Sequence, residues 1–259
     1  MNIFLTGFSG FVGKHISQFL SQKYNVIHIN LRELGSKNYL LNKLNNGDFI
    51  INCAASLRPK TQNDEYINSD FPVLLMKEIK NRNLMVKLIH LSTLNTLNKE
   101  LKDKYTLTKR KAEISLNDKS VIVIRLPLIV KLNKNKIIEN YGQVSIFFKY
   151  LKLPIFFYPM MYPGNSFNPL DINKLSIFIE EVIQGKRNEK IYNLFGKNKI
   201  NTWEIFNQIA STKGKNAFKI NLKFLTKILP KKIIFKNNFL YNILGNINFE
   251  ETECKKVFL

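Results

Sequence analysis

Three glycines near the N-terminus have the spacing of a turn that binds phosphate groups. Gly7, Gly10 and Gly13 lie in the segment TGFSGFVG at 6–13, between a predicted strand and a predicted helix. Gly7 permits the tight turn, Gly10 lets the backbone approach a pyrophosphate, and Gly13 lets the helix close on the strand. The free N–H groups at the helix start would bind the phosphates of a dinucleotide, and the alternative is a glycine-rich turn without ligand. The predicted contact residues are Gly7, Phe8, Ser9, Gly10, Phe11, Val12 and Gly13.

A tyrosine and a lysine further along the chain could carry acid–base chemistry. Tyr105 and Lys109 stand four residues apart on a predicted helix and therefore share a face. The Lys109 ammonium can lower the phenol pKa and hold a nicotinamide ribose, while the hydroxyl of Thr93 or Ser92 hydrogen-bonds a substrate oxygen. Tyr105 could then pass a proton to or from a carbinol oxygen as a hydride moves to or from the nicotinamide. The alternative is a surface tyrosine beside a solvated lysine.

The end of the second predicted strand bears on the choice between NAD and NADP. An acidic residue there would bond the adenosine 2′-hydroxyl, and a basic residue would pair with a 2′-phosphate. This chain has Asn30 at that point, followed by Arg32. The pair favours NADP over NAD, unless Arg32 is only a solvated loop cation.

Apolar strands alternate with amphipathic helices through the first half of the chain. Strands are predicted at 2–6, 25–30, 48–55, 86–93 and 121–130, and helices at 11–23, 66–83 and 105–117. Such alternation indicates a parallel sheet buried on both faces, which is a doubly wound, Rossmann-type α/β fold. We assign residues 1–130 to this dinucleotide-binding domain.

The second half of the chain predicts a smaller substrate lobe, residues 131–259, partly interleaved with the sheet and packed at its carboxyl edge. Helices are expected near 142–151, 171–184 and 202–213, a strand at 190–195, and an aromatic-rich loop at 154–167. The tail at 220–259 is basic and amphipathic. It could form a helix on a membrane surface or a helix that covers the lobe.

Composition limits the classes of function. The chain has 259 residues, 45% of them hydrophobic, and a net charge of +21 carried mostly by lysines scattered from end to end. Scattered lysines argue against nucleic acid and favour a small anionic substrate or a membrane surface. Cys53 and Cys254 are expected to be reduced thiols, with neither a disulfide nor a metal site. The N-terminus lacks a signal peptide and residues 151–164 are too short to span a bilayer, so we expect a cytoplasmic protein.

Several motifs together resemble one family. TGFSGFVG, INCAAS at 51–56, the Asn68 of EYINSDFP, LIHLST, YTLTK and VIRLPLIV are similar to extended short-chain dehydrogenases/reductases that act on nucleotide sugars, the NAD-dependent epimerase/dehydratase family. Residues 165–183, 191–210 and 244–258 resemble the later segments of that family more loosely. The resemblance implies further dinucleotide contacts at Cys53, Ala54, Ala55, Asn68, Leu91 and Pro127, in addition to Tyr105 and Lys109.

Two departures from the family pattern affect the predicted activity. The segment between Thr93 and Tyr105 is much shorter than usual, as in atypical relatives such as the dinucleotide-binding accessory subunit of respiratory complex I. Thr93 is followed by Leu94 and Asn95, where a dehydratase has an Asp-Glu pair, which argues against 4,6-dehydration. We therefore expect an NADP-dependent 4-keto reductase or 4-epimerase of a nucleotide sugar in surface polysaccharide biosynthesis. A non-catalytic NADP(H)-binding module is the alternative, and the sequence leaves open whether the chain forms a homodimer.

Overall fold

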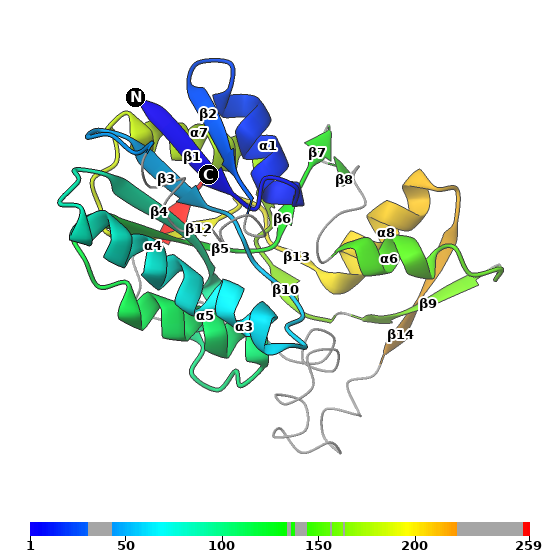
Figure 1. Ribbon diagram of the computed structural model, residues 1–259. Helices are drawn as coiled ribbons and strands as arrows, with labels where there is room; N and C mark the ends of the chain where they lie inside the picture. The colour runs from blue at the N-terminus through cyan, green and yellow to red at the C-terminus, as the bar shows by residue number, and fades with distance from the viewer. Residues whose placement is uncertain (31–42, 134–135, 138–143, 156, 163, 222–255) are drawn as a thin grey trace.

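A parallel sheet of seven strands forms the centre of the protein in a computed structural model (Figure 1). The structure describes residues 1–30, 43–133, 136–137, 144–155, 157–162, 164–221 and 256–259. The strand order is β15-β12-β5-β4-β3-β1-β2. These strands are β1 (Asn2–Thr6), β2 (Asn25–Ile29), β3 (Phe49–Asn52), β4 (Lys87–Thr93), β5 (Val121–Leu126), β12 (Ile191–Phe195) and β15 (Lys256–Phe258). The predicted doubly wound, Rossmann-type α/β fold is confirmed.

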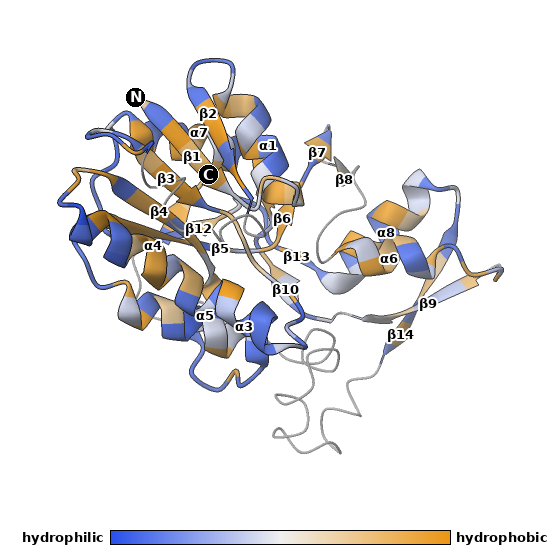
Figure 2. Cartoon of the chain, in the orientation of Figure 1, coloured by the Kyte–Doolittle hydropathy of each residue, from blue (hydrophilic) through white to orange (hydrophobic). Residues whose placement is uncertain are grey.

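Helices cover both faces of this sheet. On one face, α1 (Phe11–Leu20) and α7 (Ile172–Ile183) pack over Ile3 and Leu5. On the other face, α4 (Asp70–Asn81) and α5 (Lys104–Ser115) pack over Phe4, and α3 (Gln62–Asn68) contacts both of these helices. Because the strands are buried on both sides, their sequences are almost continuously apolar. Figure 2 shows hydrophobic residues along the central strands and hydrophilic residues along many of the surrounding loops.

The structure corrects two predictions about the first half of the chain. The helix predicted over 66–83 is divided at Ser69 into α3 and α4. Pro72 has no N–H to donate to the Asn68 carbonyl, so a continuous helix would lack that hydrogen bond. The strand predicted over 121–130 leaves the sheet after Leu126, at Pro127. Ile129–Val130 form β6, which pairs instead with β11 (Leu170–Asp171).

The smaller lobe has a core of its own between α6 (Ser145–Tyr150) and α8 (Thr202–Thr212). Beside these helices, β9 (Phe157–Tyr162) pairs in parallel with β14 (Asn216–Asn221). The aromatic-rich segment 154–167 is thus not only a loop, because it contains β9 and β10 (Ser166–Phe167). The remaining short strands are β7 (Leu132–Asn133), β8 (Lys136–Ile137) and β13 (Ile200–Asn201).

Some predictions fall outside the described residues, namely those on Arg32, on Cys254 and on most of the tail at 220–259. Within the part of the chain that the structure describes, no helix is long and apolar enough to cross a membrane. The same part of the chain holds no group of three His, Cys, Asp or Glu residues able to bind a metal ion.

Candidate functional site

The glycine turn connects β1 to α1 as the spacing predicts. Gly7 has a φ of +66°, a backbone conformation that side chains rarely tolerate, and a Cβ there would lie 2.6 Å from the Ala54 nitrogen. A Cβ on Gly13 would overlap the Gly7 carbonyl oxygen. The Gly10 N–H donates to that same oxygen at 3.0 Å. Glycine is therefore required at Gly7 for the turn and at Gly13 for the close contact between helix and turn.

The N-terminus of α1 can receive an anion. Its N-cap residue is Gly10, no side chain caps the first turn, and that turn contains no acidic residue. The backbone N–H groups of a helix's first turn and the positive end of the helix dipole are the features that bind phosphate in dinucleotide sites. The turn and the helix start thus fit a pyrophosphate. β1 lies between β2 and β3, so the turn also lies at the point where the strand order reverses.

A chain of buried polar side chains joins the carboxyl ends of β1 and β3 to the middle of β4. The Thr6 hydroxyl donates to Asn52 Oδ1 at 2.6 Å, and the Asn52 amide lies 3.0 Å from His90 Nδ1. The Ala54 N–H donates to the Thr6 hydroxyl at 3.3 Å. Burial holds the pKa of His90 well below 6.5, so the imidazole is neutral and accepts the Asn52 hydrogen. These bonds fix the turn after β1 against the loop after β3.

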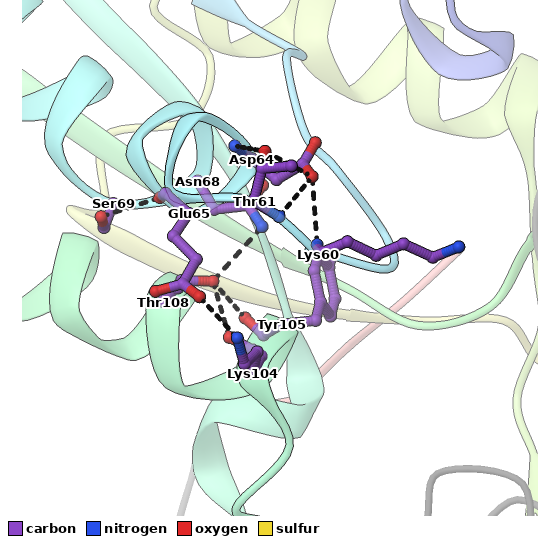
Figure 3. A network of polar contacts seen from close by, with 9 residues as sticks. All are labelled: Lys60, Thr61, Asp64, Glu65, Asn68, Ser69, Lys104, Tyr105 and Thr108. Atoms are coloured by element: carbon purple, nitrogen blue, oxygen red, sulfur yellow. Dashed lines mark hydrogen bonds and ion pairs between the residues drawn. The ribbon is translucent and has the colours of Figure 1, made fainter.

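Asn68 fixes the other side of that loop, which carries Cys53, Ala54 and Ala55. Its side chain accepts from the Ser56 N–H at 2.9 Å and donates to the Ser56 carbonyl at 2.8 Å. It also donates to the Thr108 hydroxyl at 3.3 Å (Figure 3). Asn68 therefore connects the loop to α5 by hydrogen bonds. The Cys53 side chain is half-buried, and loss of solvent raises the pKa of its thiol to about 12.

Lys109 brings α5 against the carboxyl end of β4. Its ammonium is 1% exposed and donates to the Leu91 carbonyl at 2.9 Å. Burial lowers the pKa of Lys109 to about 8, although the nearby Cys53 and Glu113 oppose the shift. Two residues beyond Leu91, Thr93 ends β4, and its hydroxyl accepts from the Asn95 N–H at 3.3 Å.

Tyr105 lies one helical turn before Lys109 and is half-buried. Burial, and secondarily the charge of Asp103, raises the pKa of its phenol above the usual value, so the group is protonated at neutral pH. No hydrogen bond joins the Tyr105 hydroxyl to Thr93 within the described ranges. The structure therefore brings Lys109 to β4 and places Thr93 at the strand end, but it does not bond the tyrosine to either.

The Ser92 hydroxyl, predicted as a possible substrate contact, is bonded within the protein instead. Its hydroxyl donates to Glu113, which also accepts from the Thr96 hydroxyl at 3.0 Å. Arg125 donates twice to Glu113, at 2.7 and 3.0 Å, and once to Asn193 at 3.3 Å. Thr93 therefore becomes the better candidate of the two hydroxyls for a substrate contact.

The short segment after Thr93 is bonded to α5. It forms the 3₁₀ turn η1 (Leu94–Leu97), and Arg110 donates to the Thr96 carbonyl at 3.2 Å and to the Asn98 carbonyl at 2.8 Å. Sequence reasoning missed Arg110, Glu113 and Arg125. One signal was present, because Arg125 stands within the apolar strand VIVIRL and a charge buried there needs a partner.

The other predicted contacts lie around the same edge of the sheet. Asn30 follows β2 directly, and Pro127 follows β5, whose last residue Leu126 is paired with Thr93. The glycine turn, the 53–55 loop, Leu91 and Pro127 thus all stand at carboxyl ends of parallel strands. This is the edge where open α/β sheets bind their ligands.

Comparison with known proteins identifies the fold. No family model and no curated protein matches the sequence. A dTDP-4-dehydrorhamnose reductase from Clostridium acetobutylicum superposes with a TM-score of 0.69 at 19% identity, over 90% of this chain and 86% of that chain. A dTDP-4-dehydrorhamnose reductase from Bacillus anthracis in complex with NADP gives 0.66 at 14% identity, over 85% and 84%.

An epimerase has the same architecture. The UDP-glucuronic acid 4-epimerase from Bacillus cereus in complex with NAD superposes with a TM-score of 0.64 at 17% identity, over 86% of each chain. These matches extend over both the large domain and the lobe. The chain therefore has the same fold as these reductases and epimerases of nucleotide sugars, with the Rossmann-type α/β sheet that its sequence predicts.

Proposed function

We propose that this protein is an NADP-dependent oxidoreductase that acts on a nucleotide sugar, by 4-keto reduction or 4-epimerisation, in surface polysaccharide biosynthesis. The contact between the Lys109 ammonium and the Leu91 carbonyl carries the proposal. It sets the Tyr105–Lys109 helix against the end of β4, next to Thr93 and on the same sheet edge as the glycine turn. The neighbours of the same fold, a 4-keto-sugar reductase with NADP and a sugar 4-epimerase with NAD, support this class of reaction.

The dinucleotide would be held by the elements of that edge. N–H groups at the start of α1 would bind its pyrophosphate, and the 53–55 loop, held by Thr6 and Asn68, would border it. When bound, the dinucleotide supplies or accepts the hydride. The buried Lys109 ammonium would hold the nicotinamide ribose. Its hydrogen bond to the Leu91 carbonyl already fixes the position of the ammonium.

Tyr105 would move the proton in this scheme. Its raised pKa keeps the phenol protonated at neutral pH, which is the form that donates a proton to a sugar carbonyl oxygen during reduction. The positive charge of Lys109 would then stabilise the phenolate that remains. The Thr93 hydroxyl would orient the same sugar oxygen, because Ser92 is committed to Glu113.

The preference for NADP depends on Asn30 and Arg32. Position 30 holds an asparagine and not a carboxylate that could accept the ribose 2′-hydroxyl, and the guanidinium of Arg32 can pair with a 2′-phosphate. Both features favour the phosphorylated cofactor.

A non-catalytic module that binds NADP(H) is the second candidate, and one observation favours it. The Tyr105 hydroxyl has no bond to Thr93 in the part of the chain that is described, and the segment between them is short. A binding module would need the glycine turn and the 53–55 loop but would have no use for a tyrosine positioned on the substrate.

Identification of the bound dinucleotide and a substrate screen decide between the two candidates. Mass spectrometry of the purified protein would show whether it carries NADP(H) or NAD(H). The loaded protein would then be mixed with dTDP- and UDP-linked sugars and their 4-keto forms while the nicotinamide absorbance is followed. Turnover with a nucleotide sugar supports the enzyme, whereas bound NADP(H) without turnover on the whole panel supports the module.

A further inference from the structure

One end of the smaller lobe exposes a group of large apolar side chains. Leu153 is 49% exposed, Ile155 37%, Phe157 65% and Phe218 44%. In Figure 1 the turn after α6 and the starts of β9 and β14 form the end of the lobe that projects away from the seven-stranded sheet. This end is therefore separate from the candidate site around Lys109 and the glycine turn.

Hydrogen bonds hold the turn of this lobe end in place. The Tyr158 hydroxyl, which is fully buried, donates to the Leu151 carbonyl at 3.1 Å and to the Leu153 carbonyl at 2.7 Å. The Leu153 N–H donates to the Tyr150 carbonyl at 3.1 Å, and the Ile155 N–H donates to the Leu153 carbonyl at 2.9 Å. The apolar side chains of the turn are consequently presented to solvent by a bonded backbone.

The pairing of β9 with β14 places both phenylalanines on one face. Phe157 is the neighbour of Asn216, two residues before Phe218, and residues two apart on a strand point to the same side. Tyr158 and Ala217 on the opposite side pack with α8. The two-stranded sheet is therefore covered by α8 on one side and exposes aromatic rings on the other.

Exposed lysines stand in the same segments at this end of the lobe, some of them beside the face that carries Tyr158. Lys149, Lys152, Lys213 and Lys215 are all exposed. The Lys213 ammonium lies 5.9 Å from the Phe148 ring centroid and that of Lys215 lies 5.8 Å from the Tyr158 ring, so aromatic rings keep two of the charges near the turn. Residues 144–162 and 213–221 contain no aspartate or glutamate.

We propose that this lobe tip, made of Leu153, Ile155, Phe157, Phe218 and the four lysines of the same segments, binds the surface of an anionic lipid bilayer. Exposed aliphatic and aromatic side chains enter the headgroup boundary, and lysines beside them bind acidic headgroups. A second copy of the chain is a poorer occupant, because it would bring lysines against lysines in a protein of net charge +21. This property is independent of the proposed reaction.

Vesicle sedimentation of the full chain tests the proposal. The wild type is expected to sediment with phosphatidylcholine vesicles that contain phosphatidylglycerol, and to remain in solution with pure phosphatidylcholine. Each lysine at an anionic surface contributes about fivefold to the binding constant, so Lys213→Gln with Lys215→Gln should weaken binding about 25-fold. Leu153→Ser with Phe157→Ser should weaken binding at every salt concentration.

The controls separate a specific surface from the general charge of the protein. Lys119→Gln with Lys174→Gln removes the same charge from exposed sites outside the lobe tip, and Met85→Ser removes an apolar side chain that is 74% exposed. Both controls should bind as the wild type does. Equal weakening by the two lysine pairs, absence of wild-type binding, or conversion of a dimer to a monomer by Phe157→Ser without effect on vesicles would overturn the proposal.

Discussion

The ammonium of Lys109 and the carbonyl of Leu91 are joined across 2.9 Å in a part of the protein from which water is excluded. This bond connects the helix that carries Tyr105 to the strand that ends in Thr93. It also places a positive charge in a region of low polarity, where its interactions with neighbouring groups are stronger than in water. The predictions below depend on this arrangement and on the elements that support it.

Replacement of Lys109 by methionine should change how stability depends on pH. In the unfolded chain the lysine has a pKa of 10.5, and in the folded protein burial lowers it to about 8. Between these two values the unfolded state holds more protons, so the contribution of this group to the free energy of unfolding rises with pH. Below about pH 8 both states are protonated and the contribution is constant.

Urea unfolding of the wild type and Lys109→Met across this pH range measures the effect. The wild type should gain stability relative to the variant between about pH 8 and 10.5. If the free energies of unfolding of the two proteins change in parallel through this pH window, the pKa of Lys109 is not lowered in the folded protein.

The turn after β1 should not tolerate a side chain at Gly13. Its Cβ would overlap the Gly7 carbonyl oxygen, and relief of such a clash shifts backbone and costs about 1–3 kcal/mol. We expect Gly13→Ala to weaken dinucleotide binding about tenfold or more, measured by fluorescence titration. Gly47→Ala is the control, because Gly47, unlike Gly13, has a positive φ, so a side chain there strains the backbone, but nothing lies within 4 Å of its Cβ position. Equal loss in both variants would mean that general destabilisation explains the result.

The pair Glu113–Arg125 should couple strongly in stability. Their side chains are only 9% and 17% exposed, so Arg125→Met leaves a nearly buried carboxylate without its cation, at a cost of about 3 kcal/mol in urea unfolding. Adding Glu113→Gln to this variant should restore part of the loss. The exposed pair Lys104–Glu65 provides the comparison, since Lys104→Met should cost less than about 1 kcal/mol. If Arg125→Met and Lys104→Met lower the free energy of unfolding by similar amounts, the prediction is wrong.

Arg32 should select NADP(H). A charge-assisted hydrogen bond contributes about 1.5–3 kcal/mol, so Arg32→Ala should weaken NADP(H) binding about 10- to 100-fold while NAD(H) binding stays nearly constant. Calorimetric titration of both cofactors into both proteins measures this selectivity. The prediction is wrong if the wild type binds the two cofactors equally or if the variant loses affinity for both.

The sequence predicts most of the large domain because its signals are local. The first strand, the glycine turn and the start of the first helix follow from spacing alone, and so do the buried strands predicted at 48–55 and 86–93, although the first of these ends at Asn52 and the helix ends at Leu20. Pro72 and Pro127 were visible in the sequence, but the division of α3 from α4 and the departure after β5 depend on how the chain packs around them. β9 escaped prediction because its alternation is weak and its partner β14 lies far away in sequence.

The candidate site shows the same limit. Tyr105 and Lys109 are recognisable by their spacing, whereas the hydrogen bonds of Asn68 to Ser56 and of Glu113 to Ser92 and Thr96 join segments distant in sequence. A single sequence gives no local sign of which buried polar residues will meet. The structure also commits Ser92 to Glu113, which the sequence could not distinguish from a role in binding substrate.

Transfer of deuterium tests the central claim most directly. The protein would be loaded with NADPH carrying deuterium at the nicotinamide C4 and mixed with 4-keto nucleotide sugars, and the sugar would be analysed by mass spectrometry. The account predicts that wild type moves deuterium to the sugar and that Tyr105→Phe does so about 10²–10⁴-fold more slowly with nearly unchanged NADPH binding. Tyr66→Phe, which alters an exposed tyrosine of α3, should behave as wild type. Tight NADPH binding without transfer to any sugar, or equal rates in Tyr105→Phe and wild type, would contradict the account.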